Sequence, residues 1–204
     1  QRSMYFSIAR KFLTVQSVMV FALIGLAEPV WLFLLGEKWI SSVEYFQLFM
    51  LISLVYPLVT VNSNIAKIHN KPKLYRDLTF LRNGLKILAL IICAKQSLVI
   101  ILYGQIIAAY ASVLVDMALC GKIINFGFWK QIRVFFNTLI KAGSAFLVAQ
   151  FVCFLIQAEI YLNGAIFTGT FILTLILIYL VTKDEVFFNY YRRMAEAVRS
   201  RIKP

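Results

Sequence analysis

The chain has 204 residues, 61% of them hydrophobic, and a formal net charge of +12. Soluble domains are about 45–50% apolar, so this composition excludes an ordinary soluble protein. Apolar runs of roughly 17–25 residues recur along the chain, and each is long enough to cross a bilayer as a helix. We therefore expect an all-α fold, a polytopic transmembrane helical bundle embedded in the lipid bilayer.

Six spanning helices are predicted, with approximate bounds 12–35, 45–65, 74–94, 97–119, 136–156 and 165–181. The first is not a cleavable signal peptide, because Glu28, Pro29 and a charged turn follow it instead of a small-residue cleavage site. A basic loop at 67–73 cannot lie in hydrocarbon and separates the second and third helices. Residues 121–133 are predicted as a cytoplasmic segment, and 183–204 as a basic cytoplasmic tail that forms a short surface helix.

The basic residues are distributed unevenly among the connections. All 21 lysines and arginines except Lys38 and Lys95 lie in the N-terminal stretch, around 67–86, around 122–141 or in the tail. Because cytoplasmic loops of membrane proteins are enriched in lysine and arginine, both termini are predicted to be cytoplasmic. Such loops, attracted to anionic lipid, account for the net charge, so no nucleic-acid partner is expected.

Residues that carry catalysis or bind metals are scarce. The single histidine, His69, lies in the basic loop without a carboxylate or cysteine at a spacing typical of a triad or a metal site. Cys93, Cys120 and Cys153 lie in or beside apolar runs, and no glycine-rich phosphate-binding loop is present. We therefore expect no enzyme, no metal site and no cofactor.

The third predicted helix carries the best candidate site. At about 100° per residue, one stripe of this helix contains Tyr75, Arg76, Thr79, Arg82, Asn83 and Lys86. A cationic stripe that reaches partway into a bilayer suits an anionic group entering from the cytoplasm, such as a pyrophosphate, and Arg76, Arg82 and Lys86 are the candidate ligands. The alternative is that Arg82 and Lys86 only extend to the interface and anchor the helix.

The fourth predicted helix contains one ionisable residue, Asp116, on a face with Gln105 and Ser112. An ionisable residue inside a span is costly and usually faces protein or water. Asp116 is therefore a candidate for gating, for binding a coupling cation or proton, or for pairing with Lys86 or Lys141. The alternative places Asp116 near the cytoplasmic end of the helix, capped or paired, with small residues permitting close helix packing.

Two prolines and two asparagines are further candidates. Pro29 and Pro57 each remove a backbone donor inside an apolar run, so they are predicted as helix hinges, with static kinks as the alternative. Asn62 and Asn64 end the second run and are predicted to form interhelical hydrogen bonds at a cytoplasmic gate. Capping of a surface helix end is the alternative for both asparagines.

Several short stretches occur in order in the first part of the chain: AEP at 27–29, LLGEKW at 34–39, FQL at 46–48, YPL at 56–58, NSN at 62–64 and YRD at 75–77. With the basic loop between the last two, this ordered set resembles the C-terminal half of bacterial polysaccharide flippases. These are O-antigen and exopolysaccharide exporters of the multidrug/oligosaccharidyl-lipid/polysaccharide exporter superfamily, and the colanic-acid-exporter type is most similar. The resemblance covers about residues 27–135. Before and after these residues, the chain resembles the family only in its hydropathy.

The resemblance implies a two-lobed exporter of which this chain is a fragment or a half-protein. Residues 1–121 would be the last four helices of the second lobe, 122–182 a C-terminal pair of helices with its preceding loop, and 183–204 a cytoplasmic tail. The N-terminal lobe would be a missing partner. The substrate would be an undecaprenyl-pyrophosphate-linked oligosaccharide, moved across the bacterial cytoplasmic (inner) membrane by alternating access, with glycan polymerase machinery as a further partner.

Three other functions remain open from the residues. A drug or cation exporter of the same superfamily would favour acidic and aromatic cavity residues, and only Asp116 qualifies. A membrane-embedded enzyme of glycan assembly would need polar clusters in outer loops, which are short here. The third possibility is a scaffold that transports nothing. It is distinguished from an exporter by whether loss of the protein leaves lipid-linked intermediates on the inner leaflet.

Overall fold

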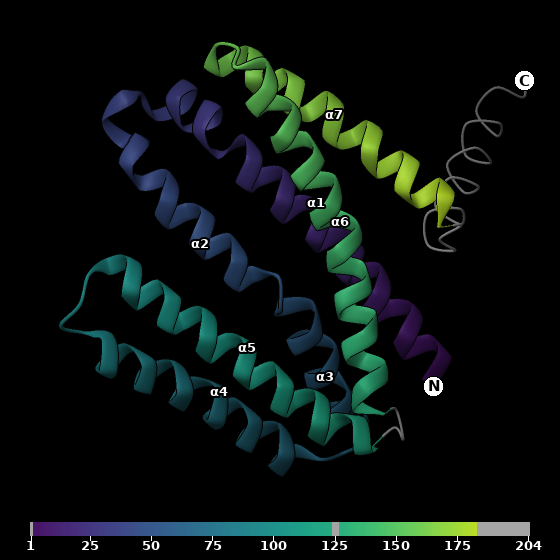
Figure 1. Cartoon of the computed structure of the whole chain (residues 1–204). Helices are drawn as coiled ribbons and strands as arrows, with labels where there is room; N and C mark the ends of the chain where they lie inside the picture. Colours follow the sequence, from purple (N-terminus) through teal and green to yellow (C-terminus); the bar gives the residue numbers. More distant parts are fainter. Residues whose placement is uncertain (1, 124–126, 183–204) are drawn as a thin grey trace, which may run out of the picture.

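The computed structural model describes residues 2–123 and 127–182, and all of its regular elements within these ranges are helical (Figure 1). The elements are α1 (Arg2–Leu35), the short 3-10 helix η1 (Glu37–Ser42), α2 (Val43–Ser53), α3 (Tyr56–Ile68), α4 (Pro72–Cys93), α5 (Leu98–Ile123), α6 (Phe128–Ile156) and α7 (Ile160–Val181). The all-α prediction is therefore confirmed. The predicted basic tail lies outside the described residues.

Five segments of the described chain are long and apolar enough to cross a membrane: Ser7–Leu35, Glu37–Ile68, Leu98–Ile123, Phe128–Ile156 and Ile160–Val181. The protein is thus a membrane-embedded, multi-pass helical protein. The sixth predicted span, α4, has 22 residues, which gives a length of about 33 Å. It is long enough to cross a membrane, but Arg76, Asp77 and Arg82 make its first half more highly charged than the five apolar segments.

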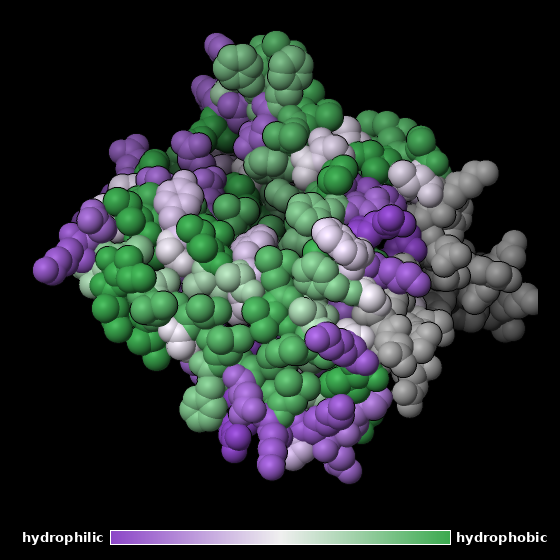
Figure 2. Space-filling model, turned by 60° about the horizontal axis from the view of Figure 1, so that its bottom comes forward, coloured by the Kyte–Doolittle hydropathy of each residue, from purple (hydrophilic) through white to green (hydrophobic). Residues whose placement is uncertain are grey.

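If α2 and α3 are taken as one segment, successive segments alternate in direction, and their connections gather at two ends of the bundle (Figure 1). The start of α1, the α3–α4 turn and the α5–α6 connection lie towards one end, and the α1–η1, α4–α5 and α6–α7 turns lie towards the other. Figure 2 shows a broad apolar surface whose hydrophilic side chains lie mostly at its margins, as expected of a surface that faces lipid. Which end faces the cytoplasm stays a prediction.

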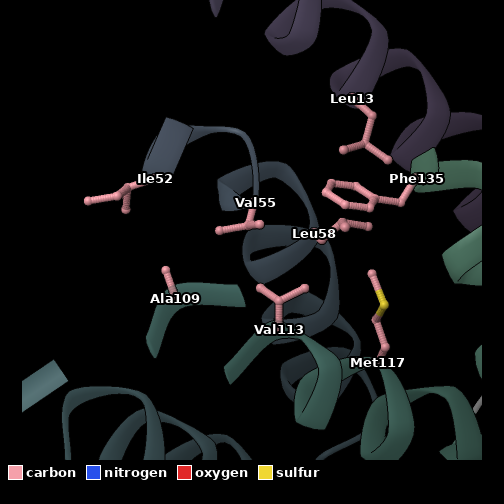
Figure 3. Packing of buried hydrophobic residues seen from close by; sticks show 8 residues of the cluster. All are labelled: Leu13, Ile52, Val55, Leu58, Ala109, Val113, Met117 and Phe135. Atoms are coloured by element: carbon pink, nitrogen blue, oxygen red, sulfur yellow. The ribbon is translucent and has the colours of Figure 1, made fainter. Parts of the chain in front are cut away.

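The largest buried cluster joins most of the chain. Figure 3 shows side chains from α1, α2, α3, α5, α6 and the α2–α3 junction meeting in one core: Leu13, Ile52, Val55, Leu58, Ala109, Val113, Met117 and Phe135. A second cluster, built around Phe167 and Phe171 of α7, contains residues of α6 and is packed against α1. α1 therefore contacts both the central helices and the C-terminal pair α6–α7.

The second predicted helix is divided into two, and the break lies next to Pro57, where a hinge or a static kink was predicted. α2 ends at Ser53 and α3 begins at Tyr56, so the break lies at Leu54 and Val55, just before Pro57. Pro57 has no N–H, so the carbonyl oxygen of Ser53 loses the donor that a continuous helix would supply. The break thus has a direct cause in the sequence.

Neighbouring helices satisfy carbonyl oxygens near this break. The Gln16 side chain of α1 donates to the carbonyl oxygen of Ser53 at 3.4 Å and to its hydroxyl at 3.2 Å. The Tyr110 hydroxyl of α5 donates to the carbonyl oxygen of Leu51 at 3.2 Å. Irregular backbone at membrane depth is tolerated when surrounding protein supplies such partners. A hinge motion at Pro57 stays a prediction.

Pro29 does not break its helix. α1 runs through Pro29 to Leu35 and ends at Gly36, which has a φ of 80°. A Cβ on Gly164 of α7 would lie 3.1 Å from Cγ of Pro29, so the glycine lets α7 approach α1 closely at this point. The hinge predicted at Pro29 is a continuous, packed stretch of helix in this structure, and any motion there stays untested.

Two predicted loops are shorter than expected. α5 extends to Ile123 and α6 begins at Phe128, so much of the predicted segment 121–133 is helical. The basic loop is a tight turn in which Asn70 adopts a left-handed conformation, with a φ of 51°, and the N–H of Lys71 donates to the carbonyl oxygen of Ala66 at 2.9 Å. This pattern is a Schellman motif, and Pro72 then starts α4.

Candidate functional site

The candidate site centres on an ion pair between α4 and α5. The Asp116 side chain is 0% exposed, and its Oδ2 lies 3.1 Å from Nε of Arg82, whose side chain is 13% exposed. Nη2 of Arg82 donates to the hydroxyl of Ser63 on α3 at 3.0 Å. The guanidinium therefore joins three helices, and it neutralises a carboxylate that would be costly alone inside a membrane helix.

The partner of Asp116 in the structure is neither of the two predicted residues. The sequence suggested Lys86 or Lys141, whereas the structure brings Arg82 to the carboxylate. Lys86 lies beside α3 instead, and Lys141 of α6 lies with its Nζ 5.5 Å from the ring centroid of Tyr179 on α7. Asp116 is deeply buried rather than capped at a surface, and small residues such as Ala109 and Ser112 share its buried face.

The three predicted pyrophosphate ligands lie apart. Arg76 is exposed and forms a 3.0 Å ion pair with its neighbour Asp77. Arg82 and Lys86 face α3, where Nζ of Lys86 lies 5.9 Å from the ring centroid of Tyr56. The structure thus places Arg82 and Lys86 along one helix junction and leaves Arg76 on the surface.

The two predicted gate asparagines also face different surroundings. Asn62 is 0% exposed, whereas Asn64 is exposed on the outside of α3. They therefore do not act as one pair, and a gating role for either stays a prediction.

α3 and α4 run antiparallel, and polar contacts connect them along their length. Nζ of Lys67 lies 4.6 Å from the ring centroid of Tyr75, and the Ser63–Arg82 and Lys86–Tyr56 contacts follow in register. Thr60 and Asn64 are exposed on α3 between these contacts. We call this strip the polar seam; its residues are Tyr56, Thr60, Ser63, Asn64 and Lys67 of α3 and Tyr75, Thr79, Arg82 and Lys86 of α4.

Of the α3 half of the polar seam, only Asn64 was singled out from the sequence, and the stripe to which it belongs was not recognised. Its residues recur at spacings of three and four, as do those of α4, so the same helical-stripe argument applied to α3 predicts it. The apolar composition of the whole run concealed this signal, because most of its other residues are aliphatic or aromatic.

The polar seam is electrostatically positive. Among the described residues, Asp116 forms an ion pair with Arg82, while Lys67 and Lys86 contact tyrosine rings and no carboxylate. Cation–π contacts orient an ammonium group without cancelling its charge. The two lysines can therefore attract an anionic group, one at each end of the strip.

Comparisons of the chain with protein-family models, with curated proteins and with solved structures found no match.

The described residues also contain no group of three histidine, cysteine or acidic side chains that could hold a metal ion. His69 caps the end of α3, where its Nδ1 lies 3.0 Å from the carbonyl oxygen of Ile65. The chemistry available at the polar seam is therefore that of cations, hydroxyl groups, an amide and aromatic rings.

Proposed function

We propose that this chain forms part of an exporter that moves undecaprenyl-pyrophosphate-linked oligosaccharides across the bacterial cytoplasmic membrane by alternating access. The observation that carries the proposal is the polar seam, a strip of cationic and hydroxyl-bearing side chains on helices inside an otherwise apolar bundle. The ordered stretches between residues 27 and 77, which resemble polysaccharide flippases, supply the substrate class.

The chemistry of the polar seam suits this substrate. Exposed polar side chains on a membrane helix face water or protein in preference to lipid. A pyrophosphate crossing the bilayer needs such a wet, cationic path, while its polyprenyl tail stays in the hydrocarbon. Of the three predicted ligands, Lys86 is the best placed to contact the phosphates, because Arg76 and Arg82 pair with described carboxylates and Lys86 contacts a tyrosine ring. Arg76, on the surface near the end of the strip, would meet the arriving head group.

Arg82 and Asp116 have a supporting role in this proposal. Asp116 neutralises the buried part of the Arg82 guanidinium and holds it at the edge of the polar seam. An anionic substrate that approaches Arg82 competes with Asp116 for the same cation, which couples substrate arrival to the α4–α5 contact. A drug or cation exporter would instead use Asp116 as an available carboxylate, and the 3.1 Å contact with Arg82 makes this alternative less suitable.

We expect Lys86→Gln in the whole protein to reduce export about tenfold or more, the effect of losing one hydrogen bond to a charged group. Surface polysaccharide and inner-leaflet lipid-linked intermediates are measured in cells that lack the native gene. Among the described residues no carboxylate pairs with Lys86, so the substitution strands no counter-ion there and the variant should fold and reach normal levels.

Lys95→Gln is the matched control, because Lys95 is exposed at the α4–α5 turn, at the far end of α4. It should export normally. Normal export by Lys86→Gln at normal protein levels would show that the polar seam only anchors α4 and would overturn the proposal.

A further inference from the structure

The α3–α4 turn holds two lysines in a fixed arrangement. The N–H of Lys71 donates to the carbonyl oxygen of Ala66 at 2.9 Å, which places Lys71 next to the last turn of α3, where Lys67 lies. The N–H of Tyr75 donates to the carbonyl oxygen of Lys71 at 3.1 Å, and the Tyr75 ring lies 4.6 Å from Nζ of Lys67. The turn is thus a compact unit with two ammonium groups and one ring.

Both lysines are exposed, and no described carboxylate pairs with either of them. The nearest acid in the sequence, Asp77, pairs with Arg76 instead, at 3.0 Å. With Lys73 at the start of α4, which is also exposed and pairs with no described carboxylate, the region of the turn presents three uncompensated positive charges to its surroundings.

The location of the turn selects a membrane lipid as the source of the complementary charge. The apolar span Glu37–Ile68 ends between these lysines, so both lie where a span leaves the hydrocarbon. Ile68, next to Lys67, is 75% exposed and presents an apolar side chain at the same end of α3. A phosphate with attached acyl chains matches this pairing of charge and apolar surface better than a free anion does.

We propose that the α3–α4 turn binds the phosphate of an anionic phospholipid, with Lys67 and Lys71 contacting the phosphate and Ile68 lying against an acyl chain. The lipid is a resident component and is not transported, so this inference does not depend on the proposed function. Tyr75 positions Lys67, and the Arg76–Asp77 pair limits the charge of the site.

Native mass spectrometry of the whole protein, purified in detergent with added phosphatidylglycerol or phosphatidylcholine, tests the proposal. The native protein should retain phosphatidylglycerol selectively. Lys67→Gln/Lys71→Gln should weaken that retention about 30-fold, the effect expected for two lysines at a membrane surface. Asp77→Asn should strengthen it about fivefold, because it releases the charge of Arg76.

Lys122→Gln/Lys130→Gln is the matched control, because it removes the same charge from two exposed positions at the α5–α6 connection. It should lose less phosphatidylglycerol than Lys67→Gln/Lys71→Gln does, because these two positions supply only the general attraction of surface lysines for anionic lipid. Equal loss in both double variants, or equal retention of both lipids by the native protein, overturns the proposal. Displacement of the lipid by millimolar inorganic pyrophosphate also overturns it, because the turn is then a site for free anions.

Export by the single variant Lys71→Gln, which changes no residue of the polar seam, separates this inference from the proposed function. Normal export with weaker retention of phosphatidylglycerol supports a resident lipid and leaves the export proposal intact. Loss of export with normal lipid retention shows that Lys71 acts on the transported molecule, which contradicts the inference.

Discussion

Asp116→Ala should lower the free energy of unfolding by about 3–5 kcal/mol, the usual cost of removing one partner from a buried ion pair. The substitution leaves the Arg82 guanidinium, only 13% exposed, without the carboxylate that lies 3.1 Å from it. Ser63 remains as a partner, but a hydroxyl group cannot neutralise the charge. Reversible unfolding of the purified protein in mixed detergent–SDS micelles measures the effect.

The double variant Arg82→Met/Asp116→Leu should recover most of this loss, because apolar side chains of similar size can replace a buried ion pair at little cost. Asp77→Ala is the matched control. It breaks an exposed ion pair and should cost less than about 1 kcal/mol. A double variant as unstable as Asp116→Ala would mean that the destabilisation comes from lost packing and not from the stranded charge.

Phe167→Ala should be the second strongly destabilising substitution. Phe167 is 2% exposed, stacks on Phe171 with ring centroids 5.5 Å apart, and contacts the ring of Phe146 on α6. Buried Phe→Ala changes cost about 3–5 kcal/mol in soluble cores. Because lipid is as apolar as a protein interior, only the packing part of this cost applies, and we expect a value of about 3 kcal/mol.

Gly25 makes this prediction specific to the α1–α7 contact. A Cβ at Gly25 would overlap the Phe167 ring, so Gly25→Ala alone should cost about 1–3 kcal/mol. In Gly25→Ala/Phe167→Ala the added methyl group enters the space that the ring leaves, so the double variant should be no less stable than Phe167→Ala. Additive losses in the same unfolding measurement would refute the contact, and Ile172→Ala, 51% exposed on α7, supplies the control.

The helices, and the concentration of basic residues in alternate connections between them, could be predicted because both are local properties of the sequence. Runs of apolar residues and the basic residues between them predicted where the helices lie, although α1 and α6 begin at Arg2 and Phe128, before the predicted starts at 12 and 136. Turns were predicted less well, since the tight α3–α4 turn depends on the left-handed conformation of one residue, Asn70. A break near Pro57 follows from its missing N–H, but its tolerance depends on Gln16 and Tyr110, which are distant in the sequence.

The ion pair shows why the site could be predicted only in part. Asp116 was recognised as a costly residue in a membrane helix and Arg82 as a candidate phosphate ligand or anchor, so the two were assigned different roles. Which cation meets the carboxylate depends on how α4 is rotated against α5, and helical periodicity within one segment contains no information about that rotation. Most of the α3 side of the polar seam was missed for a different reason, since its helical stripe lies in a run that is mostly apolar.

The most direct test of the account asks whether the polar seam faces water inside the membrane. Thr60 is exposed on α3, about 12 Å along the helix from Ile68, where the span ends. In the whole protein with its cysteines replaced by alanine, Thr60→Cys should react with a membrane-impermeant maleimide in intact membranes or inside-out vesicles, while Ile172→Cys on the apolar surface of α7 should not. If Thr60→Cys is as unreactive as Ile172→Cys, the polar seam does not line an aqueous path, and the export proposal is contradicted.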